Sequence, residues 1–311
     1  MTGHIGELAA LGTAVSWTVA ALIMERAVGK VGVMAVNTLK VTFGSVYLAL
    51  FAFVLSSHAF PSGLAPSAWL FLGASGLVGF VVGDYFLLHA YKLVGARLAM
   101  LLMSLSVPLT ALGALAVFGE KLGPWSLAGM AACVAGISIT VASGGKRAQV
   151  DKSAQVDKSA PADAALASRY RKGVTFGVLS ALAMAAATLL TKSGAVGVNP
   201  VSATQIRIGS ALAGFVAFAA VTGKMGEVTA ALRNRTWLPL IALGAVFGPF
   251  VGVGLLLFAI QHAEAGIVST LSSLTPVLII PPSVLFFGRR VGVAEIVGAC
   301  VAVFGLALLF I

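Results

Sequence analysis

Residues 118–136 read FGEKLGPWSLAGMAACVAG, and residues 287–305 read FGRRVGVAEIVGACVAVFG. In both stretches a Phe-Gly turn precedes an apolar run with two glycines seven residues apart. At an offset of 169 residues four glycines of the first stretch coincide with four of the second, namely Gly119, Gly123, Gly129 and Gly136 with Gly288, Gly292, Gly298 and Gly305. Self-similarity at a fixed spacing indicates an internal repeat, so we expect two copies of one structural unit.

The correspondence extends over the rest of each half. Further matches at offsets of 165 to 168 pair Ser104 with Ser272, Pro108 with Pro276, Gly32 with Gly197 and Gly44 with Gly209. We therefore divide the chain into a first repeat at residues 1–142, a polar linker at 143–172 and a second repeat at 173–311. The linker contains AQVDKS twice in succession from residue 148. It has no apolar face to bury, so we expect a solvated connection.

The composition indicates that both repeats lie in a lipid bilayer. Hydrophobic residues make up 59% of the 311 residues and charged residues only 10%, with a mean hydropathy of +1.04. A soluble domain has roughly a quarter charged residues. A transmembrane helix needs about 20 apolar residues, whereas a barrel would show short alternating segments. Ten continuous runs qualify as helices, at residues 5–24, 34–55, 68–90, 97–118, 124–142, 173–192, 200–222, 237–260, 266–287 and 291–311.

Each repeat contains five of these runs. Because the number of spans per repeat is odd, the second repeat must be inverted in the membrane relative to the first. We therefore predict an all-α polytopic membrane protein with ten transmembrane helices, arranged as two inverted five-helix repeats. Inverted repeats recur among transporters, where the substrate site lies near the midplane between the halves.

The charges predict which way this bundle faces. Most of the 20 Lys and Arg residues lie in the linker and in the connections after the first, third, seventh and ninth runs. On the opposite side, only Lys121 and Lys192 lie outside the helix interiors. Positive charge is retained in the cytoplasm, so we predict a cytoplasmic linker with both termini outside. The net charge of +10 does not indicate nucleic-acid binding, because no basic patch is interleaved with aromatic residues.

These features resemble the drug/metabolite transporter superfamily, in its ten-helix EamA-type branch. The resemblance covers nearly the whole chain except the linker. It rests on Pro108 and Pro276 in the fourth helix of each half, on the turn Gly119-Glu120-Lys121-Leu122 and on Trp17 in the first helix. Arg289 and Met184 depart from the pattern, since Glu and Trp would be expected there.

The resemblance implies secondary transport by alternating access through a central cavity. The first, third and fourth helices of each half would line that cavity. Relatives usually have cytoplasmic termini, which is the reverse of the orientation that the charges predict here.

Three ionisable residues, Lys40, Asp84 and Arg207, lie inside apolar runs. Such residues cost about 2.5–3.5 kcal/mol each on insertion scales and usually face the bundle interior. Asp84 would bind a substrate amine or a coupling proton; the alternative is a structural ion pair with Lys40, Arg207 or His89. Its counterpart in the second half is Val253, so the site would be asymmetric. Arg207, with Lys40, would hold a carboxylate or phosphate, or would extend to the interface or pair with Asp84.

Hydroxyl groups precede the proline in each fourth helix. Ser104, Ser272 and Ser273 would either line the substrate route or satisfy backbone groups that the proline leaves without a donor. In the functional interpretation, Pro108 and Pro276 would act as hinges.

The remaining candidates are an aromatic residue and three acids. Trp17 lies midway along the first run, in the core packing or in the cavity wall. Glu25, Glu264 and Glu295 lie near the ends of runs and are expected to face headgroups or water.

We expect a secondary transporter of small polar metabolites, with amino acids and related compounds as the favoured class and export as the direction. A carboxylate and a cation in one cavity suit a zwitterion, and protons are the candidate coupling ion. Two alternatives stay open: a lipid-carrier flippase of the same superfamily, and a membrane-embedded enzyme acting on a lipid-linked substrate. The flippase would need an opening to the bilayer between helices, and the enzyme would need clustered acids or histidines at one membrane face.

The sequence contains no Walker loop, no Cys/His metal spacing and no Ser-His-Asp arrangement. We therefore expect no enzymatic activity, no cofactor and no metal. The expected partners are a small-molecule substrate and the lipid bilayer, and not nucleic acid. The resemblance favours the cell membrane, the bacterial inner membrane in particular. Because ten helices contain both repeats, one chain can enclose a complete pathway, as a monomer or within a homodimer.

Overall fold

The computed structural model describes residues 4–56, 61, 63–153, 160–263, 265–287 and 291–309. Within these ranges the chain is helical and contains no strand. Eight helical stretches are long and apolar enough to cross a membrane, and two shorter apolar helices, Thr270–Phe286 and Val293–Leu308, occupy the places of the ninth and tenth spans. The predicted all-α polytopic fold is confirmed. Gly288, Arg289 and the second AQVDKS copy lie outside the described residues.

The first repeat forms five spans from eight helical elements. In chain order these are α1 (Ile5–Val31), α2 (Val33–Ser56), a third span of α3 (Pro66–Gly76), η1 (Leu77–Asp84) and α4 (Tyr85–Val94), a fourth span of α5 (Ala96–Met103) and α6 (Ser106–Phe118), and α7 (Pro124–Ser153).

The second repeat follows the same order with one addition. Its elements are α8 (Ala160–Gly194), α9 (Pro200–Val221), the extra helix α10 (Met225–Leu232), an eighth span of α11 (Trp237–Ala245), η2 (Val246–Gly252) and α12 (Val253–His262), a ninth span of α13 (Ala265–Ser272), α14 (Thr275–Leu278) and α15 (Ile280–Phe287), and α16 (Val293–Leu308).

Two features of these helices differ from the expected runs. The helix α10 was not expected, because its eight residues are too short to form an apolar run. The helices α7 and α8 also continue into the polar linker segment, to Ser153 and from Ala160. An apolar run marks only the part of a helix that lies in lipid. The backbone hydrogen bonds of a helix are satisfied internally whatever the polarity of its side chains, so it can continue into water.

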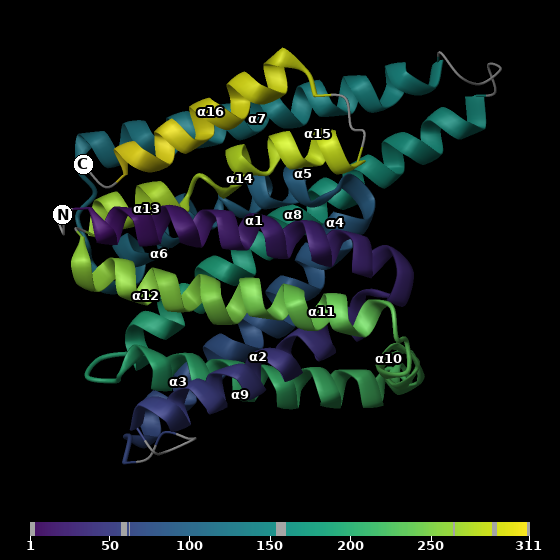
Figure 1. Cartoon of the computed structure of the whole chain (residues 1–311). Coiled ribbons are helices and arrows are strands. Elements are labelled where there is room, and N and C mark those ends of the chain that lie inside the picture. Colours follow the sequence, from purple (N-terminus) through teal and green to yellow (C-terminus); the bar gives the residue numbers. More distant parts are fainter. Residues whose placement is uncertain are drawn as a thin grey trace.

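The two repeats interlock rather than lying side by side. The first helix of each repeat packs against the third and fourth spans of the other: α1 contacts α11, η2, α12 and α13, while α8 contacts α3, η1, α4 and α6. The last helices, α7 and α16, pack along each other (Figure 1). A side chain at Gly136 or Gly305 would collide with the backbone of the opposite helix. Small residues let helices approach this closely in membranes.

A short π-helix interrupts the third span of each repeat at the same place. The segments η1 and η2 begin at Leu77 and Val246, which are equivalent at the 169-residue offset. π-Helical turns are rare and occur often at functional sites. Their presence in both repeats indicates a candidate functional site at the middle of these two spans.

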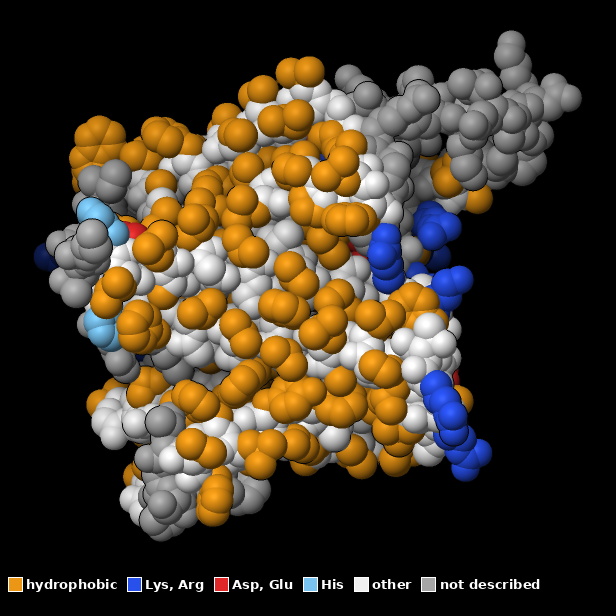
Figure 2. Space-filling view, in the orientation of Figure 1, with side chains coloured by type: hydrophobic (Ala, Val, Ile, Leu, Met, Phe, Trp, Pro, Cys, Tyr) orange, Lys and Arg blue, Asp and Glu red, His pale blue; other side chains and the backbone are white. Residues whose placement is uncertain are grey.

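The two ends of the bundle differ in charge. Both termini lie at one end, while α10 and the outer ends of α7 and α8 lie at the other (Figure 1). Figure 2 shows the Lys and Arg side chains gathered at the α10 end, which we call the basic end, and a mainly hydrophobic surface between the ends. This apolar band matches what a bilayer would cover.

Candidate functional site

Asp84 is held by two residues of α2, one at its carboxylate and one at its backbone carbonyl. Lys40 Nζ lies 2.5 Å from Asp84 Oδ2, and the two side chains are 14% and 9% exposed. One turn earlier on α2, the fully buried Asn37 donates from Nδ2 to the Asp84 carbonyl at 3.4 Å. Asp84 is the last residue of η1. The second helix of the repeat thus binds both the side chain and the backbone at the point where the π-helix returns to α-helix.

Pairing reduces the cost of placing these charges in the membrane. A carboxylate and an ammonium in contact are neutral together, and their attraction offsets part of the desolvation penalty of each. Val253 occupies the equivalent position of the second repeat, so this ion pair has no symmetric copy. Among the three ion-pair partners considered for Asp84, the structure contains the pair with Lys40.

Arg207 extends from α9 toward the same region of η1 but contacts an aromatic face rather than an acid. Its Cζ lies 5.4 Å from the centre of the Phe80 ring, a cation–π contact. Its buried Nε has no hydrogen-bond partner among the described residues. The guanidinium lies beside Gly79 of η1, where a Cβ would make an ordinary contact of 3.7 Å with Arg207 Nη2. A buried donor without an acceptor is costly, so an anion would stabilise this group.

A cavity of about 680 Å³ brings these groups together between the repeats. Trp17, Lys40, Asp84 and Arg207 all line it. The lining extends from the loop after α8, at the end with the termini, to Tyr91 near the basic end. Most of its remaining wall is apolar, including the methionines Met24, Met100, Met103 and Met184. Trp17, Lys40, Asp84 and Arg207 thus form a small polar group in an otherwise apolar and adaptable cavity.

A second cavity of about 320 Å³ contains the three predicted serines, Ser104, Ser272 and Ser273. It shares Trp17, Met100, Met103 and Leu256 with the larger cavity, so the two adjoin there. Pro276 lines the smaller cavity. Pro108 lines neither of these two cavities but is buried on α6. The predicted site residues therefore divide into a charged group in the larger cavity and a hydroxyl group in the smaller one.

The fourth and ninth spans are broken just before Pro108 and Pro276, respectively. The fourth span breaks between Met103 and Ser106, and the ninth between Ser272 and Thr275. A proline cannot donate to the carbonyl four residues earlier, which here belongs to Ser104 or Ser272. Other groups replace that donor: Val107 N donates to the Ser104 carbonyl at 3.2 Å, and Thr275 Oγ1 donates to the Ser272 carbonyl at 3.1 Å.

Trp17 is positioned by the π-helix of the second repeat. Ser16 Oγ donates to the Phe247 carbonyl of η2 at 2.6 Å. The neighbouring Trp17 indole lies against Gly252, where a Cβ would collide with its Nε1. A glycine at the end of η2 is therefore required for Trp17 to reach the cavity wall.

The structure adds residues that the sequence analysis did not single out. Asn37 lies one turn from Lys40 on α2, and Phe80 lies one turn from Asp84 on η1. Asn37 is an amide inside an apolar run, so the sequence alone could have identified it as a candidate. No sequence feature marked Tyr91 as a candidate. The second helices, α2 and α9, also line the cavity, in addition to the expected first, third and fourth.

Glu295 does not face headgroups or water. It is only 3% exposed and forms an ion pair with Arg97 of α5, so the expectation for this residue was wrong. Its position near the end of a run did not reveal that a neighbouring helix covers it. Glu25 is 8% exposed and lines a hollow at the basic end, and Glu264 lies outside the described residues.

A bundle of apolar spans built from two interlocked, inverted repeats, with a partly charged cavity between them, is a multi-pass membrane protein of transporter architecture. The sequence model described as the EamA-like transporter family matches residues 4–142 and 171–311. The chain belongs to this family of the drug/metabolite transporter superfamily, whose members are membrane transporters and not enzymes.

One solved structure, titled only "Crystal structure of protein", is similar to this chain. It is 22% identical, with a TM-score of 0.63, and the match covers 97% of this chain and 94% of that one. At this identity the likeness supports the fold alone. No curated protein matches the sequence.

Proposed function

We propose that this transporter exports small polar metabolites bearing a carboxylate, with amino acids and related compounds as the favoured class, by alternating access through the central cavity. The observation that carries the proposal is Arg207, a cation in the cavity wall with an aromatic contact and no acidic partner among the described residues. A guanidinium binds a carboxylate through two parallel hydrogen bonds. Arg207 would therefore bind the substrate's carboxylate.

The Lys40–Asp84 pair would recognise the other end of a zwitterion. A substrate ammonium has the same charge and the same donors as Lys40 Nζ, so it can replace Lys40 on the Asp84 carboxylate without changing the net charge. Lys40, which also lines the cavity, would then turn away from Asp84 and into that space. A substrate that offers both groups would satisfy Arg207 and Asp84 together.

The same pair suits coupling to protons. Protonation of Asp84 would remove its attraction for Lys40 and leave an unpaired ammonium in the membrane, which is unfavourable. A proton and a substrate amine would therefore compete for Asp84. Such competition is the simplest physical basis for exchange of one against the other.

The proposed setting is the cell membrane, with the basic end cytoplasmic and both termini outside. One chain contains both repeats and the whole cavity. In this orientation the cavity lining described above reaches the outer end, and Tyr91 lies toward the cytoplasm.

The experiment is flux of labelled amino acids in proteoliposomes with and without a pH gradient. We expect saturable flux in the wild type, loss of flux in Arg207→Gln, and loss of the gradient dependence in Asp84→Asn. Arg233→Gln, an exposed arginine outside the cavity, is the matched control and should transport normally. Full flux in Arg207→Gln would overturn the assigned role. Flux of a lipid-linked compound in place of every water-soluble one would favour the flippase alternative.

A further inference from the structure

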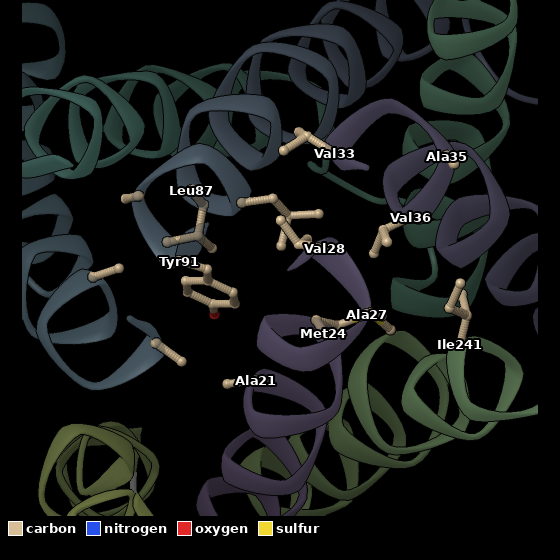
Figure 3. Packing of buried hydrophobic residues seen from close by; sticks show 14 of the residues in the cluster. Ala21, Met24, Ala27, Val28, Val33, Ala35, Val36, Leu87, Tyr91 and Ile241 are labelled. Atoms are coloured by element: carbon tan, nitrogen blue, oxygen red, sulfur yellow. The ribbon is translucent and has the colours of Figure 1, made fainter. Parts of the chain in front are cut away.

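The central cavity is closed toward the basic end by a packed layer around Tyr91. Met24 of α1 and Leu88 and Tyr91 of α4 are at most 5% exposed and belong to one hydrophobic cluster. Figure 3 shows the Tyr91 ring reaching from its helix toward Ala21 and Met24 of α1. The Tyr91 hydroxyl donates to Met100 Sδ at 3.0 Å, which ties the layer to the fourth span. Tyr91 thus closes the central cavity at the side that faces the basic end.

A separate hollow of about 560 Å³ lies on the other side of Tyr91. Its wall consists of Tyr91, Trp237, Gly29 and four charged residues, namely Glu25, Arg26, Lys30 and Lys92. Three cations against one carboxylate leave an excess of two positive charges. Tyr91 is the residue that this hollow shares with the central cavity. The two spaces therefore lie in series, with one tyrosine between them.

The general positive charge of the basic end does not explain why these cations line one hollow. Positive charge on the cytoplasmic side and cations near helix C-termini would both be satisfied by side chains spread over an open surface. Here the cations come from the ends of two different helices, α1 and α4, and line one concave space. A concave site with one sign of charge and low-dielectric walls concentrates oppositely charged solutes. Lys30 and Lys92 form no ion pair among the described residues.

We infer that this hollow is an entry site at the basic end, where the carboxylate of the transported compound binds before it passes Tyr91 to reach Arg207. The inference rests on the proposed function, because it names the place where the same substrate would first bind. It adds a residue set, Arg26, Lys30 and Lys92, that lies outside the central cavity. It also assigns Tyr91 as the wall between this entry site and the central cavity.

The test places a thiol in the hollow without disturbing it. Gly29 lines the hollow, and a Cβ there would meet nothing within 4 Å. We would prepare Gly29→Cys with Cys300→Ser, since Cys133 is buried. Gly123→Cys in the same background is the matched control, because Gly123 is equally open but lies at the other end. Each thiol is then modified by an anionic (ethylsulfonate) and a cationic (trimethylammonium) methanethiosulfonate in phosphatidylcholine nanodiscs.

We expect the ratio of anionic to cationic rates to be about tenfold higher at Gly29→Cys than at the control, given the usual size of such steering. Adding Lys30→Gln and Lys92→Gln should remove that preference. Arg26 is kept because its Nη2 donates to the Phe286 carbonyl at 2.9 Å. Sodium acetate should slow the modification more than sodium chloride at equal ionic strength. Should the double variant fold poorly, loss of the preference in high salt gives the same information on the unaltered hollow.

Equal ratios at the two thiols, or a preference unchanged by the Lys variants, would overturn the entry site. So would phosphatidylglycerol abolishing the preference while acetate has no effect, because the hollow would then bind a lipid headgroup. These measurements do not depend on flux. Absence of amino-acid transport together with protection by acetate would refute the proposed substrate and still support an anion site here.

Discussion

Lys40 Nζ and Asp84 Oδ2 lie 2.5 Å apart on neighbouring spans of the first repeat, and no equivalent pair is present at Val253 in the second. We propose that this asymmetry serves the binding of an asymmetric substrate. Two inverted copies alone would form a site with two equal halves, whereas a metabolite with different ends needs a site with different halves. The cavity acquires this difference from Asp84 on one repeat and Arg207 on the other.

Removing one member of the Lys40–Asp84 pair should destabilise the protein more than removing both. Asp84→Leu leaves a buried ammonium without a partner, a change that costs about 3–5 kcal/mol when a buried pair is broken. Lys40→Met with Asp84→Leu leaves no charge and should recover most of that stability while transport stays lost. Thermal unfolding in detergent measures the first effect and proteoliposome flux the second. A double variant as unstable as the single ones would show that packing, not charge, explains the loss.

Arg207→Lys should weaken substrate binding although it keeps the charge. A lysine ammonium cannot form the paired hydrogen bonds of a guanidinium, nor stack as well on Phe80. Since a hydrogen bond to a charged group contributes about 1.5–3 kcal/mol, we expect KM to rise about 10- to 100-fold. Saturation kinetics for a transported amino acid would measure it. If Arg207→Lys equals the wild type, Arg207 provides charge alone.

Gly252→Ala should displace Trp17 from the cavity wall. The added methyl group would overlap the indole, and overpacking of this kind typically costs about 1–3 kcal/mol. We expect lower substrate affinity and an altered emission of Trp17 in a variant with the other three tryptophans replaced. Gly254→Ala is the control, because a Cβ there meets nothing within 4 Å. Equal behaviour of the two variants would refute the Trp17 contact.

Pro108→Ala and Pro276→Ala should slow transport while leaving binding intact. The restored N–H groups can donate to the Ser104 and Ser272 carbonyls, which would close the breaks in the fourth and ninth spans. If these breaks serve as hinges, turnover should fall about tenfold while the substrate Kd changes less than twofold. Pro66→Ala is the control, because Pro66 begins α3, where proline is tolerated. Unchanged turnover in both variants would leave the prolines a structural role only.

The orientation can be read from two introduced cysteines, each in the Cys300→Ser background, since Cys300 is exposed and Cys133 is buried. Gly226→Cys lies at the basic end and Gly123→Cys at the other, and neither Cβ meets anything within 4 Å. With the basic end cytoplasmic, a membrane-impermeant maleimide added to intact cells should label Gly123→Cys and not Gly226→Cys. The reverse labelling would give the cytoplasmic termini usual for relatives. Permeabilised cells, in which both should react, are the control for reactivity.

Much of the architecture follows from the sequence because it depends on local quantities. The length of an apolar run determines whether a helix can cross a bilayer, and an odd number of runs per repeat requires inversion. A charge inside such a run must face the interior, which identified Lys40, Asp84 and Arg207 as candidates. The glycine pattern shared by the two final helices likewise identified the internal repeat, because it recurs at a fixed spacing.

The tertiary structure decided which of these groups meet. Asp84 had three candidate partners in sequence, and only the packing of α2 against η1 selects Lys40 and adds Asn37. The expected exposure of Glu295 failed for the same reason, because its surroundings are provided by Arg97, almost 200 residues earlier. The two π-helices and Tyr91 between the cavities also depend on how the spans pack. Run length and charge are properties of a segment, whereas a partner, a cavity wall or a hollow exists only where distant segments converge.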